Sequence, residues 1–91
     1  MIRLNVFIKT SIETYQNVLN AAKKLTASSV KEDGCIAYDI FTSTTRDNVL
    51  LICETWQDAE ALAAHEKTEH FQKLFNQIND VAALKIEKFQ F

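Results

Sequence analysis

The chain has 91 residues, of which 47% are hydrophobic and 24% charged, with a formal net charge of −2. These values are typical of one folded domain over residues 1–91, and they exclude a disordered chain or a basic nucleic-acid-binding chain. No apolar run approaches the roughly 20 residues of a membrane span, and the strand-like start leaves no room for a signal peptide. We therefore expect a cytoplasmic protein with neither nucleic-acid nor membrane partners.

The first third of the chain predicts a strand, a helix and a turn. Apolar side chains alternate with other residues from Ile2 to Ile8, which is the period of a strand. Thr10 and Glu13 have the spacing of a capping box, and apolar residues recur at helical spacing from about Ser11 to Val30. In the charged turn that follows, Gly34 provides a residue that tolerates positive φ.

The middle of the chain predicts a hairpin. Cys35–Thr42 and Val49–Trp56 have strand composition, and a polar stretch over residues 43–48 joins them. A hairpin that is symmetric about this stretch places Tyr38 opposite Cys53.

The last third predicts two short helices and a closing strand. Asp58 can cap a helix from Ala59 to about Glu66, and Thr68 can start a second helix that continues to Ile78. Residues 81–91 are rich in strand-forming side chains and complete the domain.

The order β-α-β-β-α-α-β favours a ferredoxin-like α+β sandwich, with helices on one face of a four-stranded antiparallel sheet. Residues 49–53 are apolar at every position, a pattern that requires burial on both faces of the sheet. A single layer of helices cannot also cover the apolar area of Phe7, Phe41, Phe89 and Phe91, and exposed area of this kind marks an interface. We therefore expect a twofold homodimer in which two sheets pack face to face, a dimeric α+β barrel.

The two histidines, His65 and His70, are the first candidates for chemistry. In a continuous helix, five residues place two side chains roughly 140° apart, on different faces. A break near Lys67 and Thr68 would bring them together, but no third ligand stands at metal-binding spacing. The sequence therefore predicts no metal site. Each histidine can be a packed or partly exposed helix residue, or one of them can be a base that works near pH 7.

Trp56 and Glu54 share one face of their strand. Trp56 can fill the corner between strand and helix or form a wall of a pocket. Glu54 on an apolar face must be paired, for example with a histidine or Arg3, or its pKa rises; it can also orient an imidazole. Asn5 points either to solvent or inward to a ligand, and the sequence leaves both alternatives open.

Four segments together resemble the antibiotic biosynthesis monooxygenase family. They are E-D-G-C-I-A-Y at 32–38, E-T-W at 54–56, A-L-A-A-H at 61–65 and T-E-H-F at 68–71. The resemblance implies a dimer with a ligand pocket between the sheet and the helices. Activities in this family include cofactor-free oxidation of quinols or polycyclic phenols by O₂, haem degradation, and isomerisation of a small phosphorylated sugar derivative.

The resemblance also separates the branches of the family. His65 stands where the haem-degrading branch has a pocket tryptophan, and Phe75 stands where it has its haem-ligating histidine, which disfavours haem degradation. The polyketide-oxidising branch has an asparagine on the third strand, and residues 49–55 contain none. The quinol-oxidising and isomerase branches, in which a histidine matching His65 borders the pocket, remain.

These observations predict a cofactor-independent and metal-free monooxygenase that acts on a small quinol-like aromatic. His65 is the expected base, and Asn5 or Tyr38 is expected to hydrogen-bond a substrate oxygen. The substrate-binding residues are expected to be Trp56, Glu54, His70 and Phe71. Two alternatives stay open: an O₂-independent isomerase of a small carbonyl metabolite, and a non-catalytic stress protein that binds a small ligand.

Overall fold

A computed structural model describes residues 1–91 and contains four strands and three helices. They are β1 (Ile2–Thr10), α1 (Ile12–Ser29), β2 (Cys35–Thr42), β3 (Val49–Trp56), α2 (Ala59–Glu66), α3 (Glu69–Val81) and β4 (Ala82–Gln90). This order confirms the expected ferredoxin-like α+β fold. No helix combines the length and the apolar character that crossing a bilayer requires.

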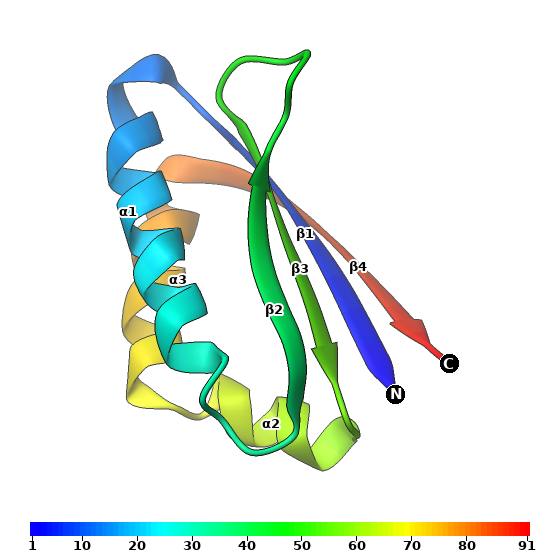
Figure 1. The fold of residues 1–91 in the computed structure, drawn as a ribbon. Coiled ribbons are helices and arrows are strands. Elements are labelled where there is room, and N and C mark those ends of the chain that lie inside the picture. The colour runs from blue at the N-terminus through cyan, green and yellow to red at the C-terminus, as the bar shows by residue number, and fades with distance from the viewer.

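The four strands form one antiparallel sheet in the order β2-β3-β1-β4. Helices α1 and α3 lie along one face of this sheet, and α2 lies at the end of the same face where β2 begins (Figure 1). The opposite face carries no helix. The fold is therefore two-layered, and the sheet has a covered face and an uncovered face.

The alternation in β1 decides which side chains the helices cover. Its even-numbered residues from Ile2 to Ile8 are buried, whereas Arg3 and Lys9 are exposed. Strand β3 contributes Leu50, Ile52 and Trp56 to the same side, and helix α1 packs against them through its own apolar stripe. The core thus lies between the helices and one face of the sheet.

The start of α1 differs from the predicted capping box. Ser11 is the N-cap, and the Thr10 hydroxyl donates to the Ser11 carbonyl at 2.9 Å instead of capping the helix. Strand β1 continues through Thr10, whose backbone N–H donates to the Asn48 carbonyl at 3.0 Å. The capping-box prediction was wrong because the sheet extends to the residue that was expected to cap.

The hairpin strands have their predicted bounds, but the register differs by one residue over most of their length. Tyr38 pairs with Glu54 rather than with Cys53, while Cys35 pairs with Trp56, as a hairpin symmetric about residues 43–48 would have it. The two registers are reconciled by an irregularity at Ile36, where β2 has one residue without a partner. The bulge places Tyr38 beside Glu54.

The break between α2 and α3 follows the predicted signals. Asp58 caps α2 by accepting the Ala61 N–H at 2.8 Å, and Thr68 caps α3 by accepting the Phe71 N–H at 3.2 Å. The Thr68 hydroxyl also donates to the His65 carbonyl at 2.7 Å, which ties the two helices together at the break.

Candidate active site

A cavity of about 270 Å³ lies between the covered face of the sheet and the helices. Twelve of its fifteen lining residues are hydrophobic, and the other three are Glu54, His65 and Glu66. Glu66 is exposed, whereas Glu54 and His65 are buried. The buried polar groups of the cavity are therefore one carboxyl group, one imidazole and the phenol hydroxyl of Tyr38, which is counted among the hydrophobic residues.

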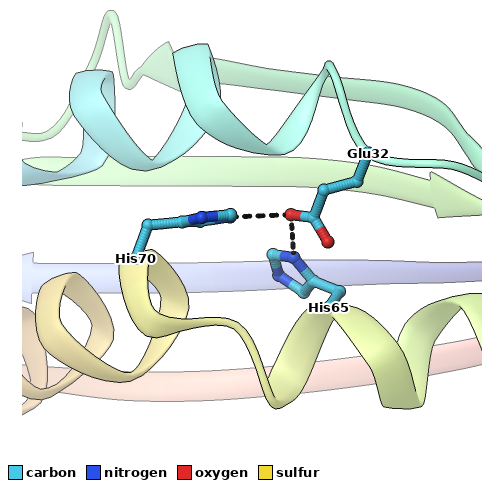
Figure 2. A group of neighbouring side chains, drawn as sticks. All are labelled: Glu32, His65 and His70. Carbon is cyan, nitrogen blue, oxygen red and sulfur yellow. Dashed lines mark hydrogen bonds and ion pairs between the residues drawn. The ribbon is translucent and has the colours of Figure 1, made fainter.

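Glu32, His65 and His70 form a hydrogen-bonded cluster, shown in Figure 2. A single carboxylate oxygen, Glu32 Oε2, lies 2.7 Å from His65 Nδ1 and 2.8 Å from His70 Nε2. The three residues come from the turn before β2, the last turn of α2 and the first turn of α3. The break at Thr68 allows both imidazoles to reach the same oxygen.

The cluster leaves one ring nitrogen of His65 free. Because an ionised carboxylate only accepts hydrogen bonds, His65 Nδ1 carries a proton, and in the neutral imidazole Nε2 then carries the lone pair. Nε2 is buried and has no hydrogen-bond partner. A buried polar atom without a partner is rare and unfavourable, and His65 lines the cavity. A bound molecule with an O–H group would provide the missing partner.

Aromatic side chains hold the His65 ring in place. The Trp56 ring lies 4.5 Å from it at an interplanar angle of 33°, and the Phe71 ring lies 4.8 Å away with an edge contact. Trp56 is fully buried and is not among the cavity-lining residues, so it packs against the imidazole without lining the cavity itself. Phe71 lines the cavity and stacks on Phe75 at 5.0 Å.

Glu54 has a hydrogen bond from indole in place of an ionic partner. Trp56 Nε1 donates to Glu54 Oε1 at 2.9 Å, while Arg3 Nε donates to Thr55 Oγ1 at 3.2 Å on the other side of the sheet. Burial raises the pKa of Glu54 to about 7, although hydrogen bonds from Trp56 and Tyr38 lower it in part. The expected pairing with a histidine or Arg3 was wrong, and the surroundings of Glu54 instead favour the alternative expectation, a raised pKa.

Tyr38 lines the cavity next to Glu54. Burial, together with the nearby charge of Glu54, raises the pKa of its hydroxyl far above the usual value. Tyr38 therefore remains a neutral phenol, and its hydroxyl hydrogen-bonds to Glu54.

Asn5 is not brought to the cavity. Its neighbours Leu4 and Val6 line the cavity, and because strand side chains alternate, Asn5 lies on the uncovered face. There its side-chain oxygen accepts a hydrogen bond from the Cys53 thiol at 3.3 Å. The structure thus groups His65, Tyr38, Glu54, Trp56 and Phe71, with His70 beside them, and separates Asn5 from this group.

Glu32 is the site residue that sequence reasoning missed. It opens the segment E-D-G-C-I-A-Y but stands 33 residues before His65, so no local spacing relates the two. Spacing along the sequence, which offered no third ligand, could not reveal this carboxylate beside the two histidines. The three groups offer atoms within 4.8 Å of one another, a set of two imidazoles and one carboxylate that can also hold a divalent ion.

Comparisons of the sequence with known proteins match it to monooxygenases. The family model described as antibiotic biosynthesis monooxygenase matches residues 1–77. The Bacillus subtilis protein named "Putative monooxygenase YcnE" is 35% identical over 72 residues, which are 79% of this chain and 76% of that protein.

Two solved structures are similar over almost their whole length. A Bacteroides thetaiotaomicron protein, described as a conserved protein of unknown function and possible oxidoreductase, is 56% identical with a TM-score of 0.96, covering 99% of this chain and 96% of that one. A structure described as an antibiotic biosynthesis monooxygenase is 26% identical with a TM-score of 0.92, covering 100% and 98%.

Proposed function

Because the chain belongs to the antibiotic biosynthesis monooxygenase family, we propose that it oxidises a small quinol-like or phenolic aromatic with O₂ without a cofactor. The observation that carries the proposal is the Nε2 atom of His65, which is buried without a partner in a residue that lines an apolar cavity, while Glu32 holds Nδ1. An imidazole in this arrangement is suited to take a proton from a bound hydroxyl group.

The volume and lining of the cavity support a small aromatic substrate. Its volume of about 270 Å³ lies near the lower end of the range for ligand pockets, about 300–1,000 Å³. The aromatic side chains of Tyr38, Phe71 and Phe75 line it together with aliphatic side chains. A molecule of one or two fused rings fits these dimensions, and the apolar lining excludes water from the reacting centre.

The first chemical step is deprotonation. In our proposal the substrate hydroxyl donates to His65 Nε2, and the proton moves to the imidazole as the phenolate forms. The Glu32 carboxylate, hydrogen-bonded to Nδ1 at 2.7 Å, stabilises the imidazolium ion that results.

The oxidation that follows uses the electrons of the substrate itself. The phenolate transfers one electron to O₂, and the superoxide and phenoxyl radical combine at a ring carbon to form a peroxide anion. In our proposal this anion takes the proton back from the His65 imidazolium, which restores the base and gives a hydroperoxide. Loss of water from the peroxide gives a quinone, so that one oxygen atom stays on the ring and the other leaves as water. A phenol supplies all four electrons that this reduction of O₂ consumes.

O₂ consumption over a panel of hydroquinones and naphthols tests the proposal, with no added metal or flavin. We expect consumption above autoxidation, and a loss of about 10²–10⁴-fold in His65→Ala, with an unchanged rate in the exposed control Lys73→Ala. Full activity in His65→Ala removes His65 from the mechanism. If no O₂ is consumed but the same compounds quench Trp56 fluorescence saturably, the protein is a binding module or an O₂-independent isomerase.

The uncovered face of the sheet supports a homodimer. Phe41 and Phe89 are about half exposed there, and Phe7 and Leu51 pair with each other on the same face. We propose that a second copy covers this face, since exposed apolar patches of this kind mark interfaces. Sedimentation is expected to give a dimer for the wild type and a monomer for Phe41→Glu. A wild-type protein that stays monomeric at micromolar concentration would overturn this proposal.

A further inference from the structure

We propose that Glu54 is a second polar contact for the bound aromatic, and that as a neutral carboxylic acid it donates a hydrogen bond to a substrate oxygen. This inference rests on the proposed function for the identity of the substrate. The contact between Glu54 and a bound aromatic can be tested by binding measurements alone, without any oxidation.

The geometry places the carboxyl group where a ligand would meet it. Glu54 and His65 are buried and line the cavity together with the buried phenol of Tyr38. Glu54 is 5% exposed, and the Trp56 indole N–H holds its Oε1 at 2.9 Å. The side chain is therefore oriented before any ligand arrives, as preorganised stabilisation requires.

The surroundings of Glu54 favour the neutral acid. No lysine or arginine lines the cavity, so an ionised carboxylate would have no cationic partner there. The titratable groups that face it are Tyr38 and Cys35 on β2, Glu32 before β2, and His65 and Glu66 on α2. Burial, helped by the negative charges of Glu66 and Glu32, raises its pKa to about 7, so the acid form is well populated at neutral pH.

A neutral acid at this position suits the proposed chemistry. As His65 takes the proton, negative charge develops on the substrate oxygen, and a carboxylic acid that donates to this oxygen stabilises the charge. An ionised Glu54 would instead repel the phenolate. Ligand affinity and turnover should therefore both fall as pH rises above about 7, the range in which Glu54 loses its proton.

Anaerobic calorimetry with 1-naphthol tests the contact. For the wild type we expect the affinity to be constant below the pKa of Glu54 and to fall up to about tenfold per pH unit above it. In Glu54→Gln the amide N–H still donates but does not titrate, so the affinity should be independent of pH over the same range. His65→Asn is the matched control, in which the fall with pH should persist because it belongs to Glu54.

An infrared difference spectrum gives a direct second measurement in the wild-type protein. The C=O stretch of a protonated carboxyl group, assigned by its absence in Glu54→Gln, should shift to lower frequency when 1-naphthol binds. The proposal is overturned if this band does not move, if wild type and Glu54→Gln have the same pH profile, or if naphthol does not bind at any pH. Binding that depends on Glu54 without O₂ consumption would leave this contact intact and reject only the oxidation.

Discussion

Glu32 Oε2 and His65 Nδ1 lie 2.7 Å apart although 33 residues separate them in the chain. The contact determines which nitrogen of the imidazole carries the shared proton, because a carboxylate that accepts from Nδ1 leaves Nε2 without a partner. Orientation and charge, rather than the mere presence of a histidine, are therefore what make this residue a candidate base.

Glu32→Gln should reduce kcat by about 10- to 100-fold, because the amide keeps the size of the side chain but cannot stabilise the imidazolium ion. We expect KM to change little, since Glu32 does not line the cavity. Steady-state kinetics on the best substrate of the panel measure both constants. Asp33→Asn is the matched control, because it removes the same charge from an exposed neighbour; an equal loss in both variants would argue for a bulk electrostatic effect.

His70→Asn should have a smaller effect than Glu32→Gln. His70 donates to the same oxygen at 2.8 Å but is 29% exposed and lies outside the cavity lining. Its removal leaves the contact between Glu32 and His65 in place, and we expect a loss of less than about tenfold in kcat. A loss as large as that of His65→Ala would mean that His70 itself takes part in proton transfer.

Gly34→Ala should lower the free energy of unfolding by about 2–4 kcal/mol. One part of this loss is the strain of a positive φ in a residue with a Cβ atom, and the other is a steric clash of that Cβ atom. Gly34 has φ of +80°, and a Cβ atom there would lie 2.5 Å from the Cβ of Ala61. Urea denaturation measures the loss. In the double variant Gly34→Ala with Ala61→Gly, the stability lost through the clash should return, whereas the stability lost through the positive φ should not. A double variant as stable as the wild type would contradict the role assigned to positive φ.

The stability of the protein should depend on pH through Glu54. Its pKa rises from 4.5 to about 7 on folding, so the folded state binds the proton more tightly than the unfolded state. The associated stability is fully present below pH 4.5 and is lost as pH rises through about 7. The loss amounts to roughly 3 kcal/mol. Denaturation at several pH values should show this slope in the wild type, and Glu54→Gln should lack it.

The sequence by itself determined the elements and their approximate ends. Strand alternation from Ile2 to Ile8, the polar stretch at 43–48 and the caps Asp58 and Thr68 all act through neighbouring residues, and the corresponding elements are present. The shared face of Glu54 and Trp56 also follows from local periodicity. The capping box at Thr10 failed because the sheet, a long-range structure, extended to that residue.

Tertiary structure alone decided the chemistry of the site. Because of the bulge at Ile36, Tyr38 pairs with Glu54 and not with Cys53. The alternation of β1 places Asn5 on one face of the sheet, but only the packing of the helices decides that this face is the uncovered one. Glu32 met the histidines through a turn and a helix break that are far apart in the chain. Periodicity and caps report interactions over a few residues, whereas proton positions and pKa shifts depend on partners and burial that only long-range packing provides.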